Sequence, residues 1–155
     1  MKLLFWRRPR VPVLVLHGIL ARRAALNIAT YGPLIDRAFA MAQGGHVVLD
    51  IDSPGGSPVQ SDLIASRIRR RAGEKGVTVT AVIGEVGASG GYWLACAADR
   101  ILVNPMSIVG SIGVVTGGFG FDEALARLGV RRRLQTAGVN KARNDPFRPE
   151  RGSPR

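Results

Sequence analysis

The segment Gly87-Ala88-Ser89-Gly90-Gly91 places a serine between glycines in the pattern Gly-x-Ser-x-Gly. An apolar, β-branched run precedes it and a run rich in Ala and Leu follows it. This is the context of a nucleophile elbow, in which a sharp strand-to-helix turn exposes a serine hydroxyl. The pattern alone is weak, because small residues also occur at such turns for packing reasons. Ser89 is therefore a candidate nucleophile that still needs a base.

A serine hydroxyl attacks a carbonyl at neutral pH when a neighbouring group accepts its proton. His17 and His46 both precede Ser89. Because α/β-hydrolases and Clp-type peptidases place the histidine after the serine, we expect both histidines to be structural. A lysine can accept the proton if burial lowers its pKa, whereas an arginine stays protonated. Three of the 22 basic residues are lysines, and Lys141 lies neither in the N-terminal tail nor in the Glu-Lys-Gly turn. Composition alone favours a solvated loop position for Lys141.

Acyl transfer also needs hydrogen-bond donors aimed at the oxyanion that develops on the substrate. The turn Asp52-Ser53-Pro54-Gly55-Gly56 follows a buried strand, and the amide of Gly55 or Gly56 can approach a ligand because neither residue has a Cβ. The amide of Gly90, at a helix start beside the candidate serine, is a second donor. The glycine pair is equally consistent with a tight strand-to-helix turn, and the two interpretations do not exclude each other.

Apolar runs alternate with segments of helical periodicity, which predicts an α/β fold with a mainly parallel sheet and covering helices. Ser57-Pro58 is a typical helix start, with a capping hydroxyl and a proline in the first turn. The segment 84–88 is expected to be a loop. The expected strands are 11–16, 46–51, 77–83, 101–103 and 132–136, with mixed strand and turn at 108–115, and the expected helices are 24–43, 58–68, 89–98 and 122–128.

The formal net charge of +11 comes with arginines in short bursts that are not interleaved with aromatic residues. Single-strand binding would favour such aromatics, so we expect no nucleic-acid partner. A solvated basic surface, with peripheral contact to an anionic membrane as the second interpretation, fits better. Cys96 stands alone, which excludes a disulfide framework and a clustered metal site, and we expect its thiol to be buried. The N-terminal apolar run is too short for a transmembrane helix or a signal peptide, which predicts a cytoplasmic chain or one peripheral to the cytoplasmic membrane.

Four blocks of the sequence together resemble the signal peptide peptidase (protease IV) family, with its SohB-like serine peptidases. They are 52–56, 88–101, 110–114, and Lys141 before the segment 145–149, and they span most of residues 11–150. The resemblance implies the crotonase/Clp-like fold and a Ser-Lys dyad of Ser89 and Lys141. It also implies that Ser111 hydrogen-bonds and positions the lysine. The glycine amides named above agree with this assignment as the oxyanion hole.

The resemblance further implies a serine endopeptidase that cleaves signal-peptide remnants or other small or unfolded peptides, as a homo-oligomer, without cofactor or metal. We expect an N-terminal tail or interfacial stub at 1–10, a peptidase domain at 11–150 and a disordered tail at 151–155. Because family members continue with further helices after the lysine, the C-terminal part of the fold is expected to be truncated. Two alternatives stay open: a truncated, inactive paralogue that binds peptides or joins oligomers, and a crotonase-like acyl-CoA enzyme. The Ala-Ser-Gly-Gly block and Lys141 argue against the second.

Overall fold

The computed structural model describes residues 11–42, 45–114, 117–135, 137 and 145–148. The chain divides into two compact units, Met1–Val114 and Val115–Arg155, which are described separately below. The peptidase domain expected at 11–150 spans both units and stays a prediction. The expected tails, 1–10 and 151–155, and the candidate base Lys141 lie outside the described residues.

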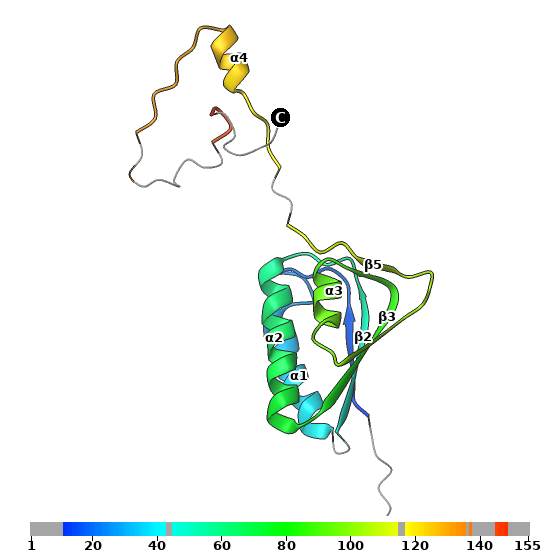
Figure 1. The fold of residues 1–155 in the computed structure, drawn as a ribbon. Helices are drawn as coiled ribbons and strands as arrows, with labels where there is room; N and C mark the ends of the chain where they lie inside the picture. Colours follow the sequence, from blue (N-terminus) through cyan, green and yellow to red (C-terminus); the bar gives the residue numbers. More distant parts are fainter. Residues whose placement is uncertain (1–10, 43–44, 115–116, 136, 138–144, 149–155) are drawn as a thin grey trace, which may run out of the picture. The chain divides into compact units, whose positions relative to one another are not determined.

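The first unit is built on a parallel sheet whose strands follow each other in chain order from one edge (Figure 1). Apolar, β-branched sequences form its central strands, which confirms the expected mainly parallel sheet. The last strand is short and pairs beside the end of the third. The strands are β1 (Val13–His17), β2 (His46–Ser53), β3 (Thr78–Ala88), β4 (Arg100–Val103) and β5 (Ile108–Gly110).

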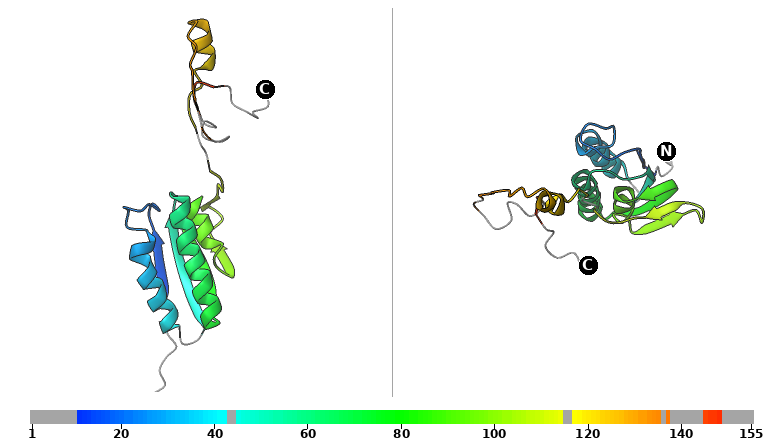
Figure 2. Two further views of the ribbon diagram at one scale, coloured as in Figure 1. Left: turned by 90° about the vertical axis from the view of Figure 1, so that its left-hand side faces the viewer. Right: turned by 90° about the horizontal axis from the view of Figure 1, so that it is seen from above.

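The three helices of this unit, α1 (Ile28–Met41), α2 (Pro58–Lys75) and α3 (Gly90–Ala95), lie on one face of the sheet (Figures 1 and 2). Side chains alternate between the two faces of a strand, so every second residue points into the core under these helices. The alternation is strict in β2, where Val47, Leu49, Ile51 and Ser53 are all buried. On the opposite face of the sheet, several apolar side chains stay exposed.

Helix α2 begins where the sequence predicted. The Ser57 hydroxyl accepts a hydrogen bond from the amide of Gln60 (3.4 Å), and Pro58 occupies the first turn. The helix continues to Lys75, further than expected, and ends at Gly76, whose φ of 61° gives the left-handed conformation that favours glycine. Helix α2 therefore runs the full height of the sheet and carries the residues that face the first turn of α3.

The third strand is longer than the sequence predicted. Residues 84–88, expected to be a loop, belong to β3; Gly87 pairs with Ser53 of β2, and residues 86–88 pair with β5. The prediction was wrong because these partners come from distant parts of the chain, and a Gly-containing segment gives no local sign of them. The extension carries β3 directly to the candidate nucleophile.

Cys96 is exposed, so the expectation of a buried thiol was wrong. Helix α3 ends at Ala95, earlier than the predicted Ala98, and Cys96 is its C-terminal cap. The neighbours Leu94, Ala95 and Ala97 occupy the buried positions, with exposed fractions of at most 2%. Because these neighbours occupy the inner side of the short helix and of the residues after it, the Cys96 thiol lies on the outer side.

The second unit contains one helix among its described residues, α4 (Asp122–Arg127), close to the prediction. The strand expected at 132–136 is not formed in its described part, 132–135. Instead Arg132 pairs closely with Asp145 and stacks over the ring of Phe147, 4.9 Å from its centroid. Burial raises the pKa of Asp145, but hydrogen bonds from the Phe147 amide and from Arg132 outweigh it and leave the pKa lowered.

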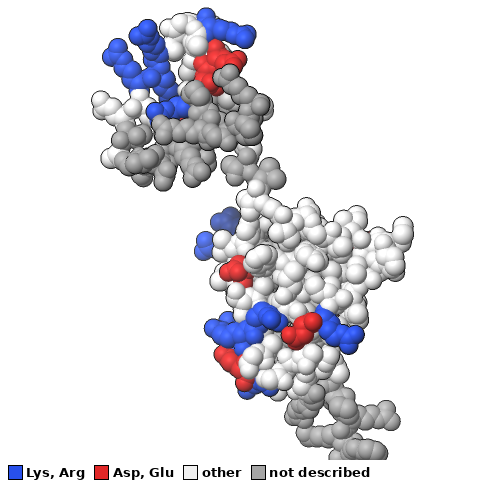
Figure 3. All heavy atoms as spheres, viewed as in Figure 1, with Lys and Arg blue, Asp and Glu red and all other residues white. Residues whose placement is uncertain are grey.

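Part of the surface of the first unit carries no charged side chains. On the face drawn in Figure 3, the surface over β5 and the end of β3 carries no charged side chain. Large apolar residues of β5 and of the segment before it are exposed, among them Met106, Ile108 and Val109. None of the helices formed by the described residues has the length and apolar character needed to cross a membrane.

Candidate active site

Ser89 lies between the end of β3 and the start of α3, in a backbone conformation that non-glycine residues rarely adopt. Its φ of 51° and ψ of −116° place it outside the ordinary regions for a residue with a Cβ. Two hydrogen bonds hold it there: its amide donates to the Gly110 carbonyl (2.7 Å), and its carbonyl accepts from the Trp93 amide (3.0 Å). Strain of this kind persists only where the surrounding structure enforces it, and it is concentrated at functional sites. The geometry is that of a nucleophile elbow.

The glycine turn after β2 touches this elbow. Gly55 has a φ of 94°, and a Cβ on it would lie 2.6 Å from the Gly90 nitrogen and 2.8 Å from the Ser89 Cβ. A Cβ on Gly90 would collide with the Ser61 hydroxyl of α2. Close packing thus requires both glycines, Gly55 against the backbone of the elbow and Gly90 against side chains of the core. The turn at 53–56 and the elbow, far apart in the sequence, form one site.

Ser53 fixes the glycine turn from inside the core. Its side chain is fully buried, and its hydroxyl donates to the Gly18 carbonyl (2.6 Å) while accepting from the Gly55 amide (3.1 Å). The Gly55 amide is therefore occupied. Sequence reasoning missed Ser53, although a polar residue at a core-facing position of β2 was a signal that could have found it.

Two other amides at this site remain candidates for an oxyanion hole. Within the described part of the chain, the Gly56 amide has no hydrogen-bond acceptor. The Gly90 amide belongs to the first residue of α3, and such amides have no acceptor within their own helix. The geometry favours Gly56 and Gly90 over Gly55 as donors, and the assignment of all three to the oxyanion hole stays a prediction.

Ser111 comes next to the elbow through the pairing of β5 with β3. The register sets Gly110 opposite Ala88, so Ser111 follows beside Ser89. Ser111 also has a positive φ, 54°, and is exposed. Because Lys141 lies outside the described residues, the Ser89–Lys141 dyad and the positioning role of Ser111 stay predictions.

A cavity of about 350 Å³ opens beside Ser89 between α2, α3 and the segment after β5. Its lining is mostly apolar, which suits an apolar side chain of a bound peptide. Sequence reasoning named Gly56, Ser89 and Gly90 but missed the apolar lining residues; Trp93 lies on α3, one turn after the elbow. The cavity is lined by Gly56, Pro58, Ser61, Asp62, Ser89, Gly90, Trp93, Ile112, Gly113 and Val114.

The histidines are engaged elsewhere, as expected for structural residues. His17 Nε2 lies 3.2 Å from Asp50 Oδ2, and His46 Nε2 lies 3.1 Å from the Thr80 hydroxyl. Both are on the sheet face that carries no helix. His17 is on β1, two strands away from β3, a separation of about 10 Å between strands. Neither histidine is placed to accept a proton from Ser89.

Comparison with known families gives a direct match. The model described as "Peptidase family S49" matches residues 71–151, which is more than half of the chain. The chain is 47% identical over 146 residues to a Brucella melitensis protein named "Na(+)/H(+) antiporter NhaA", covering 91% of this chain and 20% of that protein. It is 35% identical over 102 residues to "Probable protease SohB" of Buchnera aphidicola subsp. Schlechtendalia chinensis, covering 66% of this chain and 33% of that protein.

The same fold occurs among solved structures. A variant of the "1510-N membrane-bound stomatin-specific protease" superposes with a TM-score of 0.55 at 20% identity, covering 72% of this chain and 51% of that one. This likeness confirms the expected crotonase/Clp-like α/β fold. The chain spans a third or less of the two curated relatives. The name of the Brucella protein therefore describes a molecule of which four fifths has no counterpart here.

Proposed function

The chain belongs to peptidase family S49. We propose that it is a serine peptidase with Ser89 as its nucleophile and Lys141 as its general base. The observation that carries the proposal is the strained conformation of Ser89, held by β5 and α3 against the glycine turn. A strand-to-helix serine with these neighbours is what covalent acyl transfer requires. A packing role alone would not need a non-glycine residue at a positive φ.

In the proposed reaction the Ser89 Oγ attacks the carbonyl carbon of the scissile peptide bond while neutral Lys141 takes its proton. The carbonyl oxygen becomes an oxyanion, which the amides of Gly56 and Gly90 stabilise by hydrogen bonds. The tetrahedral intermediate then collapses, the protonated lysine gives its proton to the leaving amine, and Ser89 carries the acyl group. A water molecule, deprotonated by the lysine, hydrolyses this ester and frees the serine.

The cavity beside Ser89 supports peptides as substrates, with an apolar side chain next to the cleaved bond. Its volume of about 350 Å³ and its Trp93 and Ile112 walls fit a single side chain of medium size. Signal-peptide remnants and unfolded segments offer such side chains in extended form. We propose these as the substrates, cleaved by a homo-oligomer in the cytoplasm or at the periphery of the cytoplasmic membrane.

Labelling with a fluorophosphonate tests the nucleophile. The reagent should modify the wild-type chain at Ser89, and Ser89→Ala should lose both the label and peptide cleavage while keeping its thermal unfolding temperature. Ser66→Ala is the matched control, since Ser66 is an exposed serine of α2 and should keep full labelling. A label that persists on another serine in Ser89→Ala would refute the assignment.

The base is tested by exchanging Lys141 for an arginine. Because a guanidinium stays protonated, Lys141→Arg should lose cleavage nearly as completely as Lys141→Ala. Wild-type cleavage should rise with pH as the lysine loses its proton, with a midpoint below the ordinary pKa of about 10.4. An active Arg variant would show that positive charge, and not basicity, is what the reaction needs.

Two other functions are separated by the same assays. A peptide-binding or oligomer-forming subunit without catalysis would bind an unfolded peptide but show neither labelling nor cleavage. A crotonase-like enzyme would bind an acyl-CoA thioester and would not depend on Ser89. Both outcomes contradict the peptidase proposal. They differ in the ligand that binds, which is an unfolded peptide in the first case and an acyl-CoA thioester in the second.

A further inference from the structure

The sheet ends in β1, and one side of this strand has no neighbour among the residues that the structure describes. The Pro12 carbonyl and the Gly18 amide bond to β2, at 3.0 and 2.9 Å. Backbone groups of successive residues in a parallel pair face opposite sides, so those of Val13, Val15 and His17 point away from β2. The free edge therefore offers the N–H and the C=O of all three residues.

Among its described residues, β1 lacks the sequence features that usually protect an edge. Natural edge strands carry a lysine, an internal proline or a bulge that discourages pairing with another chain. β1 reads Val-Leu-Val-Leu-His, and it pairs with β2 without a register shift. Val13 and Val15 are 56% and 48% exposed. The described strand is apolar and regularly paired with β2, and an edge with these properties is prone to pair with another strand.

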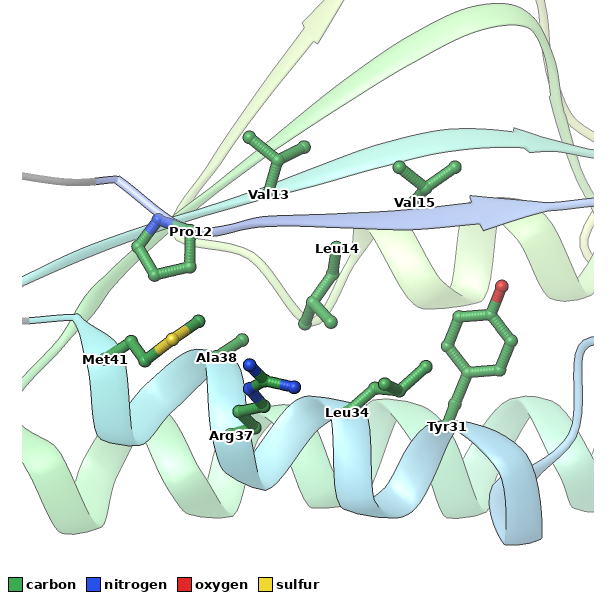
Figure 4. Close-up of a pocket in the computed structure, with 9 residues that line it drawn as sticks. All are labelled: Pro12, Val13, Leu14, Val15, Tyr31, Leu34, Arg37, Ala38 and Met41. Atoms are coloured by element: carbon green, nitrogen blue, oxygen red, sulfur yellow. The ribbon is translucent and has the colours of Figure 1, made fainter.

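A groove of about 410 Å³ runs between this edge and α1. Figure 4 shows Tyr31 and Leu34 of α1 below Val15, with Met41 at the other end of the groove below Pro12. Leu34 and Met41 are 45% and 48% exposed, far more than residues facing a core. Edge and groove together form one apolar surface that an added strand and its own helix layer can cover.

We propose that β1 binds β1 of a second copy of this chain, with the two strands antiparallel about a two-fold axis at Val15. Val15 then lies opposite the partner's Val15, and Val13 lies opposite the partner's His17. Two identical edges can meet only through such an axis, because it turns the same backbone groups of both strands toward each other. In this register each of the three residues exchanges two backbone hydrogen bonds with the residue opposite it on the partner strand. The N–H and C=O groups of the free edge are then all paired.

The helix layers and the charges fit the same arrangement. An axis perpendicular to the sheet puts both helix layers on one side, so that Tyr31 and Leu34 near the axis face their own copies. Arg37 is the charged residue of the groove, and Figure 4 shows it further from Val15 than Leu34 is. Among the residues that line the groove, the two copies of Arg37 therefore do not meet at the axis. A specific interface buries at least about 1,000 Å² in total, and the exposed apolar residues of the edge and groove form a small surface. A weak, concentration-dependent dimer is expected.

Cysteine cross-linking tests the register. In a Cys96→Ser background, Val15→Cys places two thiols on Cα atoms about 5.5 Å apart, a spacing that a disulfide spans. Val15→Cys should therefore form a covalent dimer rapidly under mild oxidation. Val13→Cys should not, because it faces the partner's His17, and adding His17→Cys should restore cross-linking. Equal rates for the two single-cysteine variants would overturn the proposed pairing.

Sedimentation equilibrium over a concentration series tests the association itself. Val15→Pro removes an N–H that faces the free edge and leaves the ladder to β2 intact. It should be monomeric at concentrations where the wild type is dimeric, with the same unfolding temperature in dilute solution. Val15→Thr is the matched control, since it keeps the N–H and the β-branched shape and should still dimerise. A wild-type chain that stays monomeric at every concentration would refute the proposal, as would Val15→Pro dimerising like the wild type.

Discussion

Replacing Gly55 by alanine should strongly destabilise the first unit, because the added methyl group meets the elbow. Gly55 has a φ of 94°, and a new Cβ would lie within 2.6 to 2.8 Å of three atoms of the elbow, the Gly90 nitrogen, the Ala88 oxygen and the Ser89 Cβ. Two of these are backbone atoms that cannot rotate aside. The methyl group must therefore push the elbow and the glycine turn apart.

The expected loss has two parts. A residue with a Cβ in such a conformation costs about 1–3 kcal/mol, and overpacking costs about 1–3 kcal/mol more. Together they remove about 2–6 kcal/mol from a free energy of unfolding of about 5–15 kcal/mol. Each kcal/mol lowers the unfolding temperature of a domain of this size by about 4–8 °C. Gly55→Ala should therefore unfold at least about 8 °C below the wild type.

Gly18 supplies the matched control. Its φ of 97° is almost the same, but a Cβ on it would meet no atom within 4 Å. Gly18→Ala should pay the conformational cost alone, so the difference between the two variants measures the close approach at the elbow. Circular dichroism gives both unfolding curves, and fluorophosphonate labelling of Ser89 should slow in Gly55→Ala more than in Gly18→Ala. Equal losses of stability would show that the contact with the elbow does not exclude a side chain.

Two further predictions concern stability. Hydrogen bonds from Arg67 and Arg71 lower the pKa of Asp36. The stabilisation is therefore present above the unfolded carboxyl pKa of about 3.9 and is lost as the pH falls below it; Asp36→Asn should flatten the unfolding temperature measured across this range. Ser53→Ala leaves the buried Gly55 amide and the Gly18 carbonyl without their partner, and urea unfolding should show a loss of about 1–3 kcal/mol. Ser66→Ala, at an exposed position, should change the stability by less than about 0.5 kcal/mol; a Ser53 variant as stable as this control would contradict the bridging role.

Features that depend on neighbours in the sequence were predictable. The helix start at Ser57-Pro58, the core strands and the strand-to-helix context of Ser89 all follow from propensity, capping and periodicity over a few residues. The structure confirms each of them. These signals are local because a hydroxyl caps an amide only a few positions away and a strand alternates its own side chains.

The shape of the site was decided by tertiary contacts. Residues 84–88 continue β3 because distant strands pair with them, and the Gly55 turn meets Ser89 because β2 and β3 end side by side. Cys96 is exposed because its neighbours fill the inner side of a short helix. Sequence patterns describe which residues prefer to be extended or buried. Which strand a residue pairs with depends on segments tens of positions away, and the free energy of that pairing overrides local preference.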